Sequence, residues 1–100
     1  MTQATALILK ALVSGNAYGF DIMDVTRLPS GTIYPALRRL EKAGYLRSRW
    51  ERQGVADHEG RPRRRFYELT ALGAGAVPLA EQSLTDTKAV LERSLGKQPG

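Results

Sequence analysis

The sequence predicts a mainly α (α+β) fold, in which short helices precede a pair of strands and a long helix ends the chain. Apolar residues recur at helical spacing within 28–44 and 71–95, whereas they alternate with polar residues within 45–51. A glycine-containing basic loop at 52–62 then leads into a second strand-like segment, 63–70. Helix, turn, helix and hairpin in this order are typical of a winged helix-turn-helix.

Length and composition limit the class of protein. The 100 residues suffice for one domain with a modest core, and 42% apolar with 25% charged residues is ordinary for a globular protein. The sequence has no cysteine, which excludes disulfides and thiolate metal sites. We expect a winged domain at 1–70, a helix at 71–95 and a disordered tail at 96–100. The apolar run near the N-terminus contains Lys10 and predicts a core helix, so we expect a cytoplasmic protein without a membrane segment.

The net charge of +5 is concentrated in the middle of the chain. Residues 27–65 hold 11 basic against 4 acidic residues, and the remainder holds 4 basic against 6 acidic. A one-sided cationic centre favours an anionic partner, nucleic acid before an anionic membrane. A merely solvated basic surface is the competing interpretation.

The first helix, expected at 4–13, is apolar on more than one face. We expect it to be covered by the C-terminal segment or by a second subunit. A turn at 14–16 leads to a second helix at about 20–26, in which Phe20 and Met23 can pack inward. The apolar residues of the first helix are Leu7, Ile8, Leu9, Leu12 and Val13.

The third helix has two unlike faces. Ser30 is expected as its N-cap and Gly44 as its left-handed C-terminal residue, with an apolar stripe between them. Pro35 either lies inside the helix, at the cost of one backbone bond, or marks a later start. The stripe consists of Ile33, Leu37 and Leu40; the polar face carries Thr32, Tyr34, Arg38, Arg39 and Lys42.

The hairpin is expected to project a basic tip. Tyr67 and Leu69 are expected to face inward, and Trp50, on a strand face with Leu46, is expected to plug the core. Thr70 can cap the last helix, which Pro78 can kink and which has no evident partner within the chain.

No catalytic constellation is present in the sequence. His58 is the only histidine and lies in the expected loop, where a solvated role is favoured over a metal ligand or general base. The sequence therefore predicts no enzyme, no metal site and no cofactor.

Several segments together resemble the PadR family of bacterial winged-helix transcriptional regulators. They are YGFDIMDVT (18–26), LPSGTIYPALRRLEKAGYL (28–46) and GRPRRRFYELT (60–70). The resemblance implies a DNA-binding regulator, usually a repressor, that binds a pseudo-palindromic operator as a homodimer. It also implies that the last helix packs against the first helix of the other subunit. Some relatives hold a small-molecule effector, which this sequence does not identify.

The resemblance and the polar face of the third helix together select the DNA-binding candidates. Arg38 is the first choice for a base contact, Arg39 for a phosphate, and Lys42 lies where it also favours the helix dipole. Tyr18 is either a backbone contact or core packing, and Tyr34 contacts a base or a phosphate. The complete set is Tyr18, Ser30, Thr32, Tyr34, Pro35, Arg38, Arg39, Lys42, Arg61, Arg63 and Arg64; the dimerisation set is Leu7, Ile8, Leu12, Leu79, Leu84, Leu91 and Leu95.

One residue departs from the family pattern, and one alternative function stays open. Arg27 stands where relatives often have glycine before Leu-Pro, so a left-handed backbone there is strained. A winged helix can also serve as a protein-interaction module without DNA binding, and the long last helix would suit such a role.

Overall fold

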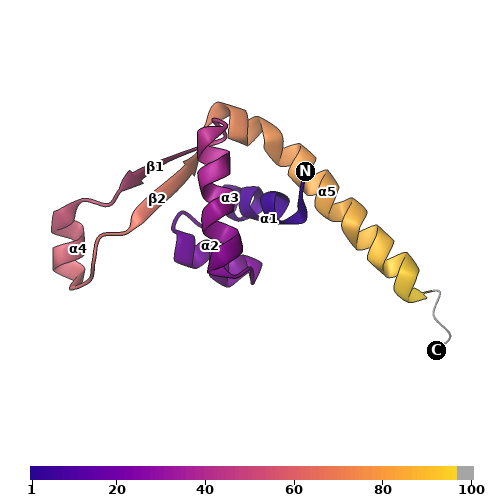
Figure 1. Cartoon of the computed structure of the whole chain (residues 1–100), viewed down its shortest axis with the longest axis horizontal. Coiled ribbons are helices and arrows are strands. Elements are labelled where there is room, and N and C mark those ends of the chain that lie inside the picture. The colour runs from indigo at the N-terminus through magenta and orange to yellow at the C-terminus, as the bar shows by residue number, and fades with distance from the viewer. Residues whose placement is uncertain (97–100) are drawn as a thin grey trace.

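A computed structural model of the chain describes residues 1–96 and confirms the mainly α fold with a two-stranded antiparallel sheet (Figure 1). The winged helix-turn-helix consists of three helices and a hairpin, and a long helix follows it. The elements are α1 (Gln3–Val13), α2 (Gly19–Thr26), α3 (Ser30–Lys42), β1 (Leu46–Trp50), α4 (Gln53–Glu59), β2 (Arg65–Leu69) and α5 (Ala71–Gly96).

The core lies where α1, α2 and α3 meet beneath the base of the sheet. Ile8, Ile22, Ile33 and Leu37 are all fully buried there. Phe20, expected to pack inward, is instead 72% exposed. The two-turn α2 presents one narrow face to the core, and Ile22 occupies it.

Helix α3 runs without interruption through Pro35, so the first of the two alternatives for this proline holds. The prediction of Ser30 as the N-cap is wrong by one residue. Pro29 takes the cap position without a side-chain bond, and its carbonyl accepts from the N–H groups of Thr32 and Ile33. Gly44 has φ +89°, which confirms the left-handed residue after the helix.

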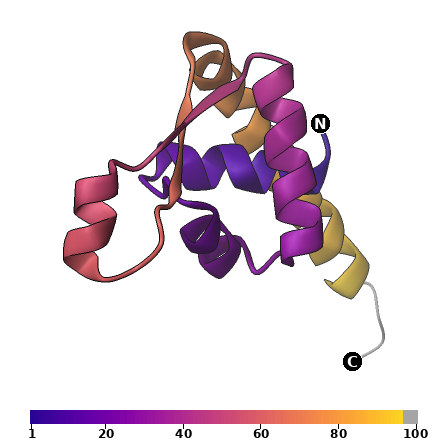
Figure 2. The same ribbon diagram turned by 60° about the vertical axis from the view of Figure 1, so that its left-hand side comes forward.

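The two strands pair from Leu46↔Leu69 to Trp50↔Arg65. The segment before α2 continues the sheet, since the Tyr67 N–H donates to Ala17 O at 2.8 Å and Tyr18 bridges to Phe66. Tyr67 is buried and Leu69 half-buried against the core, as expected. Trp50 is not the expected core plug, because it is 54% exposed. Its end of the hairpin extends beyond the helices that would cover it (Figure 2).

The wing, defined as residues 46–69, ends in a helix where a loop was expected. Two turns of α4 form at 53–59 and end at Gly60, whose φ of +67° closes the last turn. The N–H groups of Gly60 and Arg61 bond to carbonyls of that turn. Ala56 is fully buried, so the tip carries a small apolar contact of its own.

Helix α5 covers α1 of its own chain, which is the first of the two alternatives expected for α1, so the last helix does have a partner within the chain. Its first half packs along α1, where Ala76 and Ala80 join the core and Glu81 pairs with Lys10 at 2.9 Å. Thr70 caps the helix as expected, with its Oγ1 accepting from Gly73 N at 3.1 Å. Pro78 does not break the helix.

The second half of α5 projects away from the domain on the side opposite the wing (Figure 1). The radius of gyration is 16.1 Å and the extents are 58 × 30 × 21 Å, larger than the ~13 Å expected of a compact chain of this length. Gly96 belongs to α5, and the rest of the expected disordered tail, 97–100, lies outside the described residues.

Candidate nucleic-acid interface

A cleft of about 440 Å³ separates α3 from the wing. Its walls combine aromatic rings with guanidinium groups. Tyr34 and Arg38 come from α3, Tyr18 from the start of α2, and Trp50 with Arg63, Arg64 and Arg65 from the wing. The cleft therefore brings together four arginines of the cationic centre, one from α3 and three from the wing.

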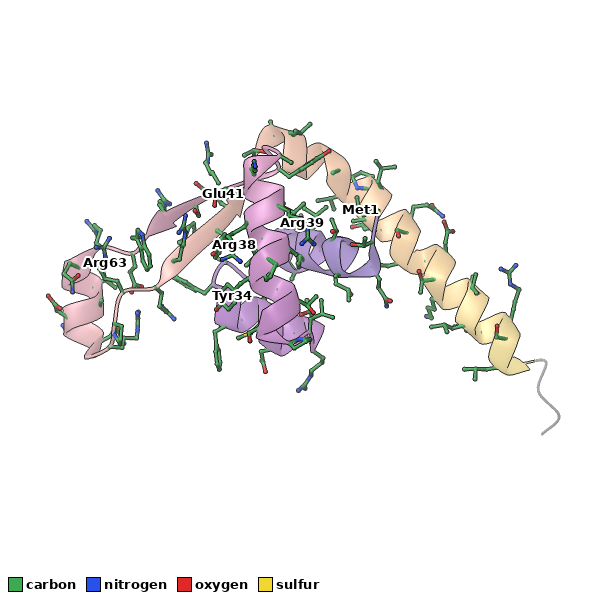
Figure 3. All side chains as sticks on the ribbon, in the orientation of Figure 1. Met1, Tyr34, Arg38, Arg39, Glu41 and Arg63 are labelled. Atoms are coloured by element: carbon green, nitrogen blue, oxygen red, sulfur yellow. The ribbon has the colours of Figure 1, made fainter. Side chains whose placement is uncertain are left out.

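Helix α3 keeps its cations free. Ile33, Ala36, Leu37 and Leu40 are buried, and the opposite face is turned to solvent. In Figure 3, Arg38 projects toward the wing side of α3 and Arg39 toward the other side. Within residues 1–96, none of the exposed cations of α3 forms an ion pair. The exposed residues among the α3 candidates are Ser30, Tyr34, Arg38, Arg39 and Lys42; Thr32 and Pro35 are half-buried.

Tyr34 is held in place by its contact with α2. A Cβ atom on residue 19 would lie 2.8 Å from Tyr34 Cε1 and from its hydroxyl, so the ring occupies the space that the missing side chain leaves. Tyr34 remains 39% exposed at the mouth of the cleft.

An ion cluster joins α3 to the wing. Ser48 Oγ donates to Glu41 and accepts from Nε and Nη2 of Arg65 at 2.9 and 2.8 Å. Arg65 Nη2 also lies 3.5 Å from Glu41 Oε1. Glu41, the only acidic residue of α3, therefore has its charge offset by an arginine of the wing.

A second cluster joins the wing tip to the start of α2. Glu51, whose side chain is 7% exposed, accepts from Arg61 Nη2 at 2.9 Å, and Arg61 Nη1 bonds its other oxygen. Arg64 Nη2 lies 3.3 Å from the same carboxylate. The hydrogen bonds from Arg61, and then those from Arg64, lower the pKa of Glu51 from 4.5 to about 2, although burial opposes them. The same pairing raises the pKa of Arg61.

These contacts divide the arginines of the wing. Both terminal nitrogens of Arg61 bond Glu51, which favours a structural role for Arg61 over the DNA contact expected of it. Arg64 stacks on Tyr18, with its Cζ 3.8 Å from the ring centroid, and remains partly accessible. The Tyr18 ring supports Arg64 and packs edge-on against Phe66, which agrees with the packing role; its contact with the DNA backbone stays a prediction. Arg63 is exposed and bonds only the Glu51 carbonyl, through Nε at 2.9 Å.

The DNA-binding set named from the sequence omits Trp50 and Arg65, which both line this cleft. The guanidinium groups of Arg63 and Arg65 lie 5.6 and 5.7 Å from the Trp50 ring centroid. The alternating pattern of residues 45–51 was the one signal in the sequence that could have located Trp50 on the hairpin. The strand register pairs Trp50 with Arg65, at the end of the hairpin that leads into α4.

The dimerisation candidates separate into two groups. Ile8 is fully buried against its own chain and is therefore a core residue, unavailable to a partner. Leu7, Leu12 and Leu84 are half-buried. Leu79, Leu91 and Leu95 are each more than half exposed, and the last two lie on the projecting half of α5.

Metal and membrane sites are not evident in the part of the chain described. Residues 1–96 contain no group of acidic and histidine side chains arranged to hold a metal ion. No helix in this range has the length and apolar character needed to cross a bilayer.

A helix-turn-helix with free cations on its second helix, flanked on the same side by a basic wing, defines a class of DNA-binding proteins. The chain belongs to the transcriptional regulator PadR-like family, whose model matches residues 8–78. It is accordingly a DNA-binding transcriptional regulator, as the resemblance implied.

Solved structures of the same fold support this assignment. A PadR family transcription regulator from Clostridium difficile R20291 is 26% identical, with a TM-score of 0.74 over 94% of this chain and 99% of that one. The protein smu.1704 from Streptococcus mutans UA159 is 28% identical, with a TM-score of 0.73 over 97% and 90% of the two chains. A transcriptional regulator from Clostridium thermocellum is 26% identical, with a TM-score of 0.69 over 90% and 87%. No curated protein shows significant sequence similarity.

Proposed function

We propose that the protein is a homodimeric repressor that binds a pseudo-palindromic operator, with α3 of each subunit in the major groove. The observation that carries this proposal is the free cationic face of α3 beside the cationic wing, on one side of the molecule. Two such surfaces related by a two-fold axis would meet half-sites about one helical turn apart.

The residues divide into those that read bases and those that hold phosphates. Arg38 lies near the middle of the exposed face of α3 and suits the bidentate pairing of a guanidinium with guanine O6 and N7. Tyr34 lies one turn before Arg38 and Thr32 lies in the first turn of α3, and both supply hydroxyl groups for further base or phosphate contacts. Ser30, Arg39 and Lys42 lie at the edges and ends of the helix, where phosphates would pass. Arg63 and Arg64 supply the charge of the wing.

Dimerisation through α5 is supported by its unpartnered apolar side chains. The helix has 26 residues, yet its buried side chains lie only in the half that packs on α1. Exposed leucines along a projecting helix favour burial against a second copy. Leu79, Leu91 and Leu95 are the proposed contacts of α5, with Leu7, Leu12 and Leu84 at the edge of the same surface.

The dimer is tested with a double substitution, Leu91→Glu with Leu95→Glu, which places charges on the proposed contact but leaves the core of the subunit untouched. We expect light scattering to report a dimer for the wild type and a monomer for the variant, with unchanged helix content by circular dichroism. Leu72→Glu, at an equally exposed leucine near the start of α5, is the control and should remain dimeric. A variant that stays dimeric would remove Leu91 and Leu95 from the interface.

The two-fold symmetry of the operator is tested by selecting bound fragments from random duplex DNA and footprinting the selected fragments. We expect two related half-sites of inverted orientation, protected with a centre-to-centre spacing of about 10 base pairs or a multiple of it. A single unrepeated half-site would contradict the two-fold arrangement. A reporter gene placed downstream of the selected operator then distinguishes repression from activation.

A further inference from the structure

The cleft between α3 and the wing lies where one strand of the DNA backbone must pass. If α3 occupies a major groove and the wing the adjacent minor groove, the two elements straddle the sugar-phosphate strand that separates those grooves. The cleft walls then face that strand directly. This step rests on the proposed function.

Trp50 is the large exposed apolar group on the wing side of this cleft. The residue is 54% exposed, although exposure of a tryptophan to water is unfavourable. The guanidinium groups of Arg63 and Arg65 lie over the ring, 5.6 and 5.7 Å from its centroid. An exposed indole with two cations beside it matches the chemistry of a nucleotide backbone, which offers an apolar deoxyribose face between two phosphates.

The flanking cations are positioned before any ligand arrives. Arg65 is fixed by two hydrogen bonds to Ser48 and by its approach to Glu41, and Arg63 is fixed by the Glu51 carbonyl. Arg65 is half-exposed, so its remaining N–H groups stay available to an anion. Positioning of this kind reduces the entropy lost when a phosphate binds.

We propose that Trp50 packs against a deoxyribose of the backbone strand crossing the cleft, while Arg63 and Arg65 bind the phosphates on either side of that sugar. The contact is independent of base sequence. Trp50 therefore contributes affinity, and it fixes the distance between the wing and α3 on the duplex. Neither Trp50 nor Arg65 was among the residues that the sequence singled out for DNA binding.

Trp50 is the only tryptophan of the chain, so fluorescence excited at a wavelength that tyrosine does not absorb reports on this position alone. The experiment measures acrylamide quenching of the full-length protein, free and saturated with a random-sequence duplex at low salt. Saturation is established separately by the anisotropy of a label on the DNA. We expect the quenching constant to fall at least about twofold in the complex, because the sugar covers the exposed part of the ring.

Substitutions give a second, independent readout. Trp50→Ala should weaken duplex binding about tenfold without changing the salt dependence, because an apolar contact releases no counterions. Trp50→Phe should retain most of the affinity, and Leu72→Ala, at an exposed leucine of α5 outside the cleft, should retain all of it. Arg65→Ala should instead lower the slope of affinity against salt by about one phosphate contact.

The outcomes separate this inference from the proposed function. Unchanged quenching in a saturated complex, or full affinity in Trp50→Ala, would overturn the assignment of Trp50 while leaving DNA binding intact. Failure of the wild-type protein to bind any duplex at low salt would overturn the proposed function itself.

Discussion

The ring of Tyr34 in α3 rests on the backbone of Gly19 in α2, so closely that a methyl group at residue 19 would lie 2.8 Å from two of its atoms. This contact links the two helices of the helix-turn-helix at the mouth of the cleft between α3 and the wing. It makes the absence of a side chain at residue 19 a condition for the orientation of Tyr34.

Gly19→Ala is therefore expected to move Tyr34 without unfolding the domain. The atoms that clash belong to the far end of a side chain that is partly exposed, so the ring can swing aside at a cost of less than about 1 kcal/mol. DNA affinity should fall because Tyr34 loses its position. Gly31→Ala, at a helical glycine with open space around it, is the matched control for stability. Equal affinity of Gly19→Ala and wild type for a selected operator would show that the orientation of Tyr34 is immaterial.

Alanine substitutions at Gly73 and Gly75 in α5 are expected to change the stability of the protein in opposite directions. A Cβ on Gly73 would lie 2.0 Å from the Tyr45 carbonyl oxygen, which cannot rotate away, whereas a Cβ on Gly75 meets nothing. Gly73→Ala should destabilise the protein by about 1–3 kcal/mol or more through overpacking. Gly75→Ala should stabilise it by up to about 1 kcal/mol through helix propensity. Urea denaturation measures both, and a stabilised Gly73→Ala would contradict the close approach of α5 to the turn before β1.

Arg27 is strained in the left-handed region, with φ +62° at the end of α2. Arg27→Gly should raise the free energy of unfolding by about 0.5–1 kcal/mol, because relief of the Cβ clash outweighs the added entropy of the unfolded chain. Thermal denaturation measures the change, with Arg27→Ala as the control that removes the cation but keeps the strain. A gain in Arg27→Ala equal to that in Arg27→Gly would assign the effect to charge.

Glu51 predicts a pH dependence of stability. Its pKa is lowered from 4.5 to about 2 in the folded protein, so the unfolded chain takes up the proton first as the pH falls. The stability contributed by Glu51 is thus fully present above pH 4.5 and is lost toward pH 2. Urea unfolding of wild type and Glu51→Gln, measured from neutral pH down to pH 2, should show a difference in unfolding free energy that is full above pH 4.5 and shrinks toward pH 2. Glu68→Gln, which removes an exposed pair with Arg47, should differ little at any pH. A Glu51→Gln difference that does not vary with pH would contradict the ionic role.

Most of the fold followed from periodicity. The stripe Ile33, Leu37 and Leu40 located α3, and the alternation around Leu46 located β1, because both patterns report directly on burial. The errors arose where tertiary geometry decides. Gly60 was taken as part of a loop, but it ends α4, since a glycine with positive φ terminates helices as readily as it opens turns.

The candidate site was predicted less completely than the fold. The sequence pattern does not show that the hairpin extends beyond the core. Trp50 was therefore expected inside the core, and Arg65 was left out of the DNA-binding set. The pattern also cannot distinguish an arginine that binds an internal carboxylate from one that is free. Arg61 and Arg63 are two residues apart, yet the first is held by Glu51 and the second faces solvent.

The most direct test of the interface is a salt titration of duplex binding by wild type, Arg38→Ala and Arg63→Ala, using a selected operator and a random duplex. We expect wild-type affinity to fall steeply with salt, with a slope of about −0.9 per phosphate neutralised. Arg38→Ala should lose about 1–3 kcal/mol of the preference for the operator, and Arg63→Ala should weaken both duplexes alike with a slope reduced by about one. Wild-type affinity that does not change with salt, or the same sequence-independent loss in both variants, would contradict the assignment of α3 and the wing as the DNA-binding surface.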